Sequence, residues 1–204
     1  MTRLHVNPTR MVMNELHQKL SIARQGHKLL KEKQDSMIRE FIEYYDQANV
    51  LRKQLEIDIS KMNRNYNLAT LESDEAYVLQ ALQASAEGMH VTERRDSVMG
   101  TTIPKYKLTG ETRQQYHPVV MSSHYRIDKV ADMHPTVKML LVELAEVEKT
   151  CFILGAEIKA TRRRVNALEH KTIPDIEETI TYIKLRLDDQ VRSQQARIMK
   201  VTKK

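Results

Sequence analysis

Two apolar stripes at helical spacing, one in each half of the chain, limit the possible folds most strongly. The first stripe runs through residues 13–69 and the second through residues 137–201. Their steps average about 3.5 and about 3.6 residues, respectively, as in coiled coils and straight helices. Each stripe covers roughly 60 residues, or about 90 Å of helix. Because a single helix of that length cannot bury its own stripe, we predict an antiparallel hairpin of two long helices.

The facing stripes are expected to form the seam of a two-helix coiled coil, with partners whose residue numbers sum to about 210. Under that register Leu30 would lie opposite Ile180. The seam residues are predicted to include Leu16, Leu20, Leu30, Met37, Phe41, Leu55, Cys151, Ile158, Val165, Ile176, Ile180, Ile183 and Leu187.

The composition agrees with a thin, largely helical molecule. The 204 residues include five glycines, five prolines and no tryptophan, and 29% are charged while 5% are aromatic. This profile is typical of long exposed helices rather than of a domain with a thick core. The single cysteine, Cys151, excludes an internal disulfide, and on the stripe we interpret it as a packed thiol.

Positive charge is concentrated at the two ends of the chain. Residues 1–34 hold seven Lys or Arg and two acids, whereas residues 190–204 hold five basic residues and no acid. An antiparallel hairpin would bring these ends together as one basic surface. Such a surface can be merely solvated, or it can be built to sit among acidic groups of a partner.

The elements outside the stripes are expected to be short. Asn7 is a candidate cap and Pro8 a candidate first helical residue for a long helix over 8–73. A central insert over 74–134 should hold short helices and a β-hairpin near 92–108, with its turn near Gly100.

The second long helix is expected over 135–201, opened by Pro135. Pro174, inside this helix, should bend it, and the stripe's four-residue steps there predict a locally unwound coil. The predicted class is therefore all-α with a β-hairpin insert, arranged as a single rod-like domain over 1–204.

No motif in the chain supports catalysis. The glycines are isolated, so no phosphate-binding loop exists, and the sequence contains no HExxH motif or Cys/His cluster. We expect no catalytic, metal-binding or cofactor-binding residues. The first twenty residues lack the apolar block of a signal peptide, and no apolar run approaches the ~20 residues that span a bilayer. We therefore expect no direct membrane insertion.

Arg162, Arg163 and Arg164 stand in the middle of the second stripe and cover about 200° of helix surface. At least one of them must point away from any helix pairing. The triplet is either a solubilising patch or a contact to an acidic partner or to phosphate.

Two segments of the chain carry specific motifs. The N-terminal segment is Asn7-Pro8-Thr9-Arg10-Met11, followed by Leu16, Leu20, Ala23, Gly26, Leu29-Leu30-Lys31, Lys33 and Asp35. The C-terminal segment is Arg163-Arg164-Val165-Asn166-Ala167-Leu168-Glu169-His170, then Ile173-Pro174-Asp175-Ile176-Glu177 and Tyr182-Ile183. Together the two segments resemble the D subunit of the vacuolar and archaeal-type rotary ATPases.

The resemblance implies a central rotor shaft that carries no active site. Its paired termini would insert into a ring of catalytic and nucleotide-binding subunits of the A and B types. A small F-type subunit would grip its middle, and a funnel-shaped subunit would link it to the membrane rotor that moves H⁺ or Na⁺. The chain would lie in the cytoplasm, peripheral to the membrane, in the soluble sector of the complex.

On this interpretation the basic end is a bearing surface, whose expected ring contacts are Arg10, Arg162, Arg163, Arg164, Arg192 and Arg197. A basic coiled-coil arm that binds nucleic acid is the alternative, but it would place Lys and Arg along one face. A structural filament is a third class, and such proteins usually keep one period without a β insert.

Overall fold

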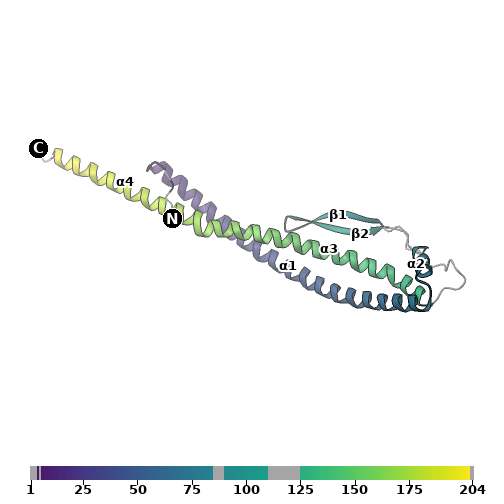
Figure 1. The fold of residues 1–204 in the computed structure, drawn as a ribbon. Helices are drawn as coiled ribbons and strands as arrows, with labels where there is room; N and C mark the ends of the chain where they lie inside the picture. Colours follow the sequence, from purple (N-terminus) through teal and green to yellow (C-terminus); the bar gives the residue numbers. More distant parts are fainter. Residues whose placement is uncertain (1–3, 5, 85–89, 110–124, 203–204) are drawn as a thin grey trace. The chain divides into compact units, whose positions relative to one another are not determined.

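The structure, a computed structural model, describes residues 4, 6–84, 90–109 and 125–202, and it confirms long helices with a two-stranded hairpin between them (Figure 1). The elements in chain order are α1 Arg10–Glu72, α2 Glu75–Ala84, β1 His90–Val98, β2 Thr101–Thr109, α3 Tyr125–Ala167, the π-helical turn η1 Leu168–Thr172, and α4 Ile173–Thr202. Their contacts divide the chain into two compact units, a first unit of Met1–Ile38 with Glu157–Lys204 and a second unit of Arg39–Ala156.

In the first unit, the start of α1 packs against α4. Leu16, Ile176, Ile180 and Ile183 form its buried cluster, and Ile183 is completely shielded from solvent. The two helices run antiparallel, because an ion pair joins Arg24 of α1 to Glu177 of α4 (2.7 Å), whereas His27, further along α1, lies 3.4 Å from Glu169 of η1, which precedes α4.

Helix α1 begins at Arg10 and is capped by Thr9, whose hydroxyl oxygen accepts a hydrogen bond from the N–H of Val12 at 3.3 Å. The predicted cap at Asn7 with Pro8 as first helical residue is therefore wrong by two positions. The backbone carbonyl of Asn7 instead accepts a bond from the N–H of Thr9. A threonine side chain at the cap position accepts a hydrogen bond from one of the unpaired N–H groups of the first turn, so Thr9 can cap the helix in place of Asn7.

The segment before α1 also contacts α4. The N–H of Leu4 donates to the hydroxyl of Thr179 at 3.2 Å, and that hydroxyl donates to the carbonyl of Asp175 at 2.6 Å. Thr179 is fully buried, and both hydrogen-bonding functions of its hydroxyl are used.

The predicted local unwinding near Pro174 takes the form of the π-helical turn η1. Pro174 has no N–H to offer a carbonyl four residues earlier. In the preceding turn, the N–H of Ile173 bonds to the carbonyl of Leu168 and the Thr172 hydroxyl bonds to the carbonyl of Ala167, both five residues back. One extra residue in the turn matches the four-residue steps of the stripe, so Ile176 and Ile180 remain in the core.

A buried hydroxyl in the first unit gives a stability prediction. The side chain of Thr161 is fully buried, and its hydroxyl has no partner among the described residues. Thr161→Val should therefore raise the free energy of unfolding by about 1 kcal/mol, because an unpaired buried hydroxyl is costly. Thr179→Val is the matched control and should lower it by a similar amount, since it leaves the N–H of Leu4 without its acceptor. Thermal and urea unfolding of the two variants should shift in opposite directions, and a common direction contradicts this interpretation.

In the second unit, the remainder of α1 packs against α3. The buried cluster contains Ala48, Leu55, Val137, Leu144 and Val147. A second cluster joins Ala69 of α1 to Val78 of α2 and Ile127 of α3. Ion pairs join Arg52 to Glu148 and Glu72 to Arg126, so α1 and α3 are also antiparallel.

The structure corrects both the start of the second long helix and the pairing register. Helix α3 begins at Tyr125, and Pro135 lies inside it rather than at its first turn. Ile127 and Val130, before the proline, are buried, and this burial offsets the backbone hydrogen bond that Pro135 cannot make.

The earlier start also moves the register. Arg24 with Glu177 and Arg52 with Glu148 have residue numbers that sum to 201 and 200, not about 210. The expected opposition of Leu30 and Ile180 is therefore wrong. The shift of about ten residues equals the error in where the second helix begins.

The hairpin has the predicted place and turn. Val98 pairs with Thr101 across the two-residue turn Met99-Gly100, whose φ angles of 52° and 77° are both in the left-handed region. A turn with two positive φ values has the twist that antiparallel strands favour, and glycine adopts the second value without strain.

Candidate partner-binding surfaces

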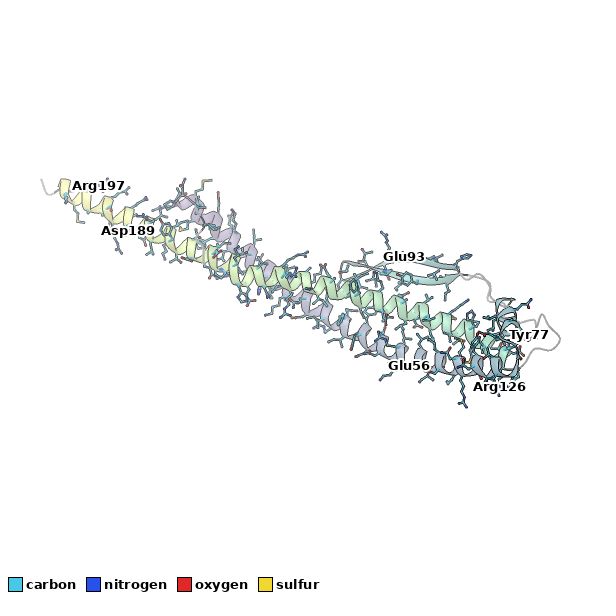
Figure 2. The ribbon with its side chains drawn as sticks, viewed as in Figure 1. Glu56, Tyr77, Glu93, Arg126, Asp189 and Arg197 are labelled. Carbon is cyan, nitrogen blue, oxygen red and sulfur yellow. The ribbon has the colours of Figure 1, made fainter. Side chains whose placement is uncertain are left out.

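The hairpin attaches to the helices of the second unit through β2. Ile103 and Pro104 of β2 are buried, whereas β1 is exposed at every position except Val98. The N–H of Tyr106 points out of the sheet and donates to the carboxylate of Glu146 on α3 at 2.7 Å. Glu146 thus satisfies one N–H on the edge of β2 that faces away from β1, while β1 stays exposed to solvent (Figure 2, where Glu93 of β1 is labelled).

Charged groups surround this attachment. The ammonium group of Lys105 lies 3.0 Å from the carboxylate of Asp96 and hydrogen bonds to it, and the N–H of Ser97 donates to the same carboxylate at 2.8 Å. The hydrogen bond from Lys105, followed by the bond from Ser97, holds the pKa of Asp96 below its ordinary value, and the Asp96 carboxylate raises the pKa of Lys105. Burial, followed by the negative charge of Glu40, raises the pKa of Tyr44 on the neighbouring face of α1.

Removing the amine should return the pKa of Asp96 toward its ordinary value. In Lys105→Ala the bond from Ser97 remains, so the recovery should be incomplete. A carboxylate with a lowered pKa stabilises the hairpin at neutral pH and loses that contribution as the pH falls through its folded-state pKa. NMR titration of the Asp96 carboxyl carbon measures the shift, with Lys107→Ala as the control. Equal titration curves in wild type and Lys105→Ala contradict the assignment.

The six arginines expected to contact a ring are all exposed: Arg10, Arg162, Arg163, Arg164, Arg192 and Arg197. All of them belong to the first unit. Within the triplet, Arg164 lies 3.8 Å from Glu157. For Arg162 and Arg163 the described residues provide no ion-pair partner, so their guanidinium groups are available to another molecule.

Beyond Leu187, helix α4 has no covering element in the described part of the chain. Every described side chain from Asp188 to Lys200 is exposed, including Val191, Ile198 and Met199 at 39%, 65% and 60%. Figure 2 labels Asp189 and Arg197 on this length of helix. The C-terminal turns of α4 therefore combine exposed apolar residues with Arg192, Arg197 and Lys200 and no acid after Asp189.

The predicted seam residues are buried or half-buried without exception. Leu16, Met37, Leu55 and Val165 are among the buried ones, as are three isoleucines of α4. Cys151 is half-buried. Its pKa is raised, mainly by burial and secondly by the negative charge of Glu148. A thiol with a raised pKa is a weak nucleophile, as expected for a packing residue.

The described residues show neither a metal-binding arrangement nor a membrane-spanning helix. No three His, Cys, Asp or Glu side chains among them come close enough together to hold an ion. None of the helices in the described ranges combines the length and apolar content needed to cross a bilayer.

Sequence reasoning missed Glu146 and Glu148 as positioning residues. Glu146 fastens the hairpin to α3, and Glu148 pairs with Arg52 across the helix pair. Both flank Val147, a buried residue of the second apolar stripe, so their position beside that stripe was the available signal. The identity of their partners depends on the pairing register of the helices. The register predicted from the sequence was wrong by about ten residues.

Comparisons with known proteins agree along almost the whole chain. The family model that describes the D subunit of ATP synthase matches residues 12–203. The V-type ATP synthase D subunit of Enterococcus faecalis (strain ATCC 700802 / V583) is 37% identical over 204 residues, covering 98% of this chain and 97% of that protein. The V-type ATP synthase D subunit of Thermoanaerobacter sp. (strain X514) is 33% identical over 202 residues, covering 98% and 97%. With its paired long helices, its hairpin and this full-length similarity, the chain belongs to the family of ATP synthase D subunits.

Proposed function

We propose that this chain is the non-catalytic rotor subunit of the central stalk in a V/A-type ATPase. It would transmit torque between ATP hydrolysis or synthesis in a ring of A-type and B-type subunits and the translocation of H⁺ or Na⁺ by a membrane rotor. The observation that carries the proposal is the bare end of α4, where apolar and basic side chains are exposed together. Such an end is suited to insertion into a surrounding protein ring.

The helix pairs support a mechanical role. Two antiparallel helices packed along a continuous seam resist bending better than one helix does. The buried clusters of the two units contain aliphatic side chains from both helices, and no group of three His, Cys, Asp or Glu that could hold a metal ion occurs among the residues that the structure describes. Helices paired in this way are suited to transmitting force.

The charge pattern disfavours the alternative of a nucleic-acid-binding arm. Arg24, Arg52 and Arg126 each pair with a glutamate on the neighbouring helix. These pairs interrupt any continuous basic face, which binding to a phosphate backbone would require. The exposed arginines of the triplet and of α4 instead fit contacts to acidic loops of the ring, with a small F-type subunit and a funnel-shaped subunit as further partners. The chain would then work at the cytoplasmic side, peripheral to the membrane.

Reconstitution tests the proposal. The purified chain alone should hydrolyse no ATP, whereas ring subunits assembled with it and with the membrane sector should couple hydrolysis to ion uptake into vesicles. Assemblies lacking the chain should lose ion uptake while keeping some hydrolysis. Robust ATP turnover by the chain after removal of contaminating ring subunits would falsify the non-catalytic role, and ion uptake at the normal rate without the chain would contradict the rotor role.

A further inference from the structure

Helix α1 carries a second apolar strip that is exposed to solvent. In the second unit, the side chains of Val50, Ile57 and Leu71 are 67%, 50% and 82% exposed. They are separated by seven and fourteen residues, so they recur at one heptad position. The same sequence spacing includes Ile22 and Leu29 of the first unit, which are 68% and 65% exposed.

The strip lies on the face of α1 opposite the one that packs against α3. Leu51, Leu55 and Ile59 belong to the packed face, and Ile57 follows Leu55 by two residues, or about 200° around the helix. A helix that packs on one neighbour needs one apolar face. In Figure 1 no labelled element of the second unit lies on the side of α1 that faces away from α3. The second apolar face is therefore left uncovered by the described residues.

Basic side chains lie on both borders of the strip, at Lys53 and Lys61, and within it, at Arg64. Between its first and last members, Lys53, Lys61 and Arg64 fall within about 45° of the line through Ile57, and the sequence places no acid in that sector. All three basic side chains are exposed. Lys61 also lies 3.4 Å from Asp58, a contact that leaves its side chain 61% exposed. A complementary surface would combine an apolar centre with acidic borders.

We propose that this strip, formed by Val50, Ile57 and Leu71, binds an amphipathic α-helix of another subunit, with apolar residues flanked by Asp or Glu. The proposal rests on the proposed function, because it takes the partner from the same complex. The residues of the strip recur about every 10.5 Å along the helix axis, or every two turns, and a helix lying alongside presents its own apolar residues at the same spacing. A β-strand presents side chains on one face about every 7 Å, so its side chains would not stay in register with those of the strip.

A second copy of this chain is a poorer occupant than an acidic helix. Two copies paired through their strips would bring Lys53, Lys61 and Arg64 close to the same cations of the other copy. Like charges at such positions destabilise helix pairs, whereas a helix bordered by Asp or Glu would form attractive contacts with them.

The test uses the complex purified with its own partner subunits. Ile57→Asp places a charge at the centre of the strip, while Met139→Asp places the same charge on α3 at a side chain that is 62% exposed. Ile57→Asp should weaken retention of one partner subunit at least tenfold, and Met139→Asp should not. Circular dichroism of the free chains should be the same for both variants. Retention in Ile57→Asp that equals the Met139→Asp control overturns the proposal.

A photo-crosslinking benzoylphenylalanine at position 57 identifies the occupant. Crosslinks that map to a helix with acidic residues beside its apolar face support the proposal. Crosslinks to a second copy of this chain, or to a loop or strand, overturn it. The two proposals fail differently: unaltered retention in Ile57→Asp leaves the rotor role intact, whereas failure of the wild-type chain to purify with ring subunits removes the rotor role itself.

Discussion

An Ile183→Asp chain is expected to lose the pairing of α4 with the start of α1. The Ile183 side chain is completely buried in a cluster with Leu16, Ile176 and Ile180. A carboxylate there either remains ionised without a partner in an apolar site or must be protonated, and the aliphatic contacts are lost in both cases. The expected loss exceeds about 4 kcal/mol, which is large for a single substitution.

Leu185→Asp is the matched control for this variant. Leu185 lies two residues further along α4 and is 61% exposed, so the same change should leave stability nearly unaltered. Amide hydrogen exchange over residues 10–38 is the decisive measurement. Protection of this segment should fall in Ile183→Asp and persist in Leu185→Asp. Unchanged protection in Ile183→Asp shows that α4 does not hold the start of α1 in solution.

Reversing Arg162, Arg163 and Arg164 to glutamate together should weaken assembly with the ring at least fivefold. All three side chains are exposed, so the fold of the free chain should change little. Exposed ion pairs are worth about 0.2–1 kcal/mol each, and three attractive contacts would be replaced by repulsions of similar size, for a total of about 1–6 kcal/mol. Weak individual contacts also suit a rotating bearing, because a deep energy minimum at one angle would stall it.

Ionic strength separates electrostatic from steric contacts in this experiment. The affinity of the wild-type chain for the ring should fall as salt rises, whereas the triple variant should depend on salt much less. The control reverses Arg94, Arg95 and Lys107, three hairpin residues, and introduces the same change in net charge. If the arginine triplet variant assembles and turns over ATP like wild type, the triplet contributes only by packing.

Hydrophobic periodicity predicted most of the fold because long helices and hairpins leave local signals. The alternating three- and four-residue steps located α1 and α4, and Gly100 between β-formers located the turn, where the structure has a φ of 77°. These patterns depend on residues close in sequence, so tertiary context did not override them.

The start of α3 was mispredicted because two local signals pointed the wrong way. Pro135 resembles a helix start, and His134 interrupts the apolar positions Ile127, Val130 and Val137 with a polar residue. In the structure His134 is half-buried, and burial is the main cause of its lowered pKa, so it acts as part of the stripe. The tertiary burial of Ile127 and Val130 decided the boundary, and the register followed from it.

Candidate contact residues could be predicted only as far as their exposure. Charge clustering selected six arginines that the structure places at the surface of the first unit. Which of them meet a partner depends on surfaces that this chain does not contain. The strip through Val50 and Ile57 escaped the sequence interpretation because its heptad position is diluted by Ser36, Glu43 and Arg64.

Direct observation of rotation tests the central claim of a torque-transmitting shaft. A bead would be attached through biotin to Thr92→Cys, an exposed residue of β1, in a chain whose Cys151 is replaced by serine, with the ring subunits fixed to glass. On addition of ATP, the bead should turn in one direction in steps that stop when ATP is removed. Steady ATP hydrolysis by the same complexes, with beads that show only random fluctuation, would contradict the claim.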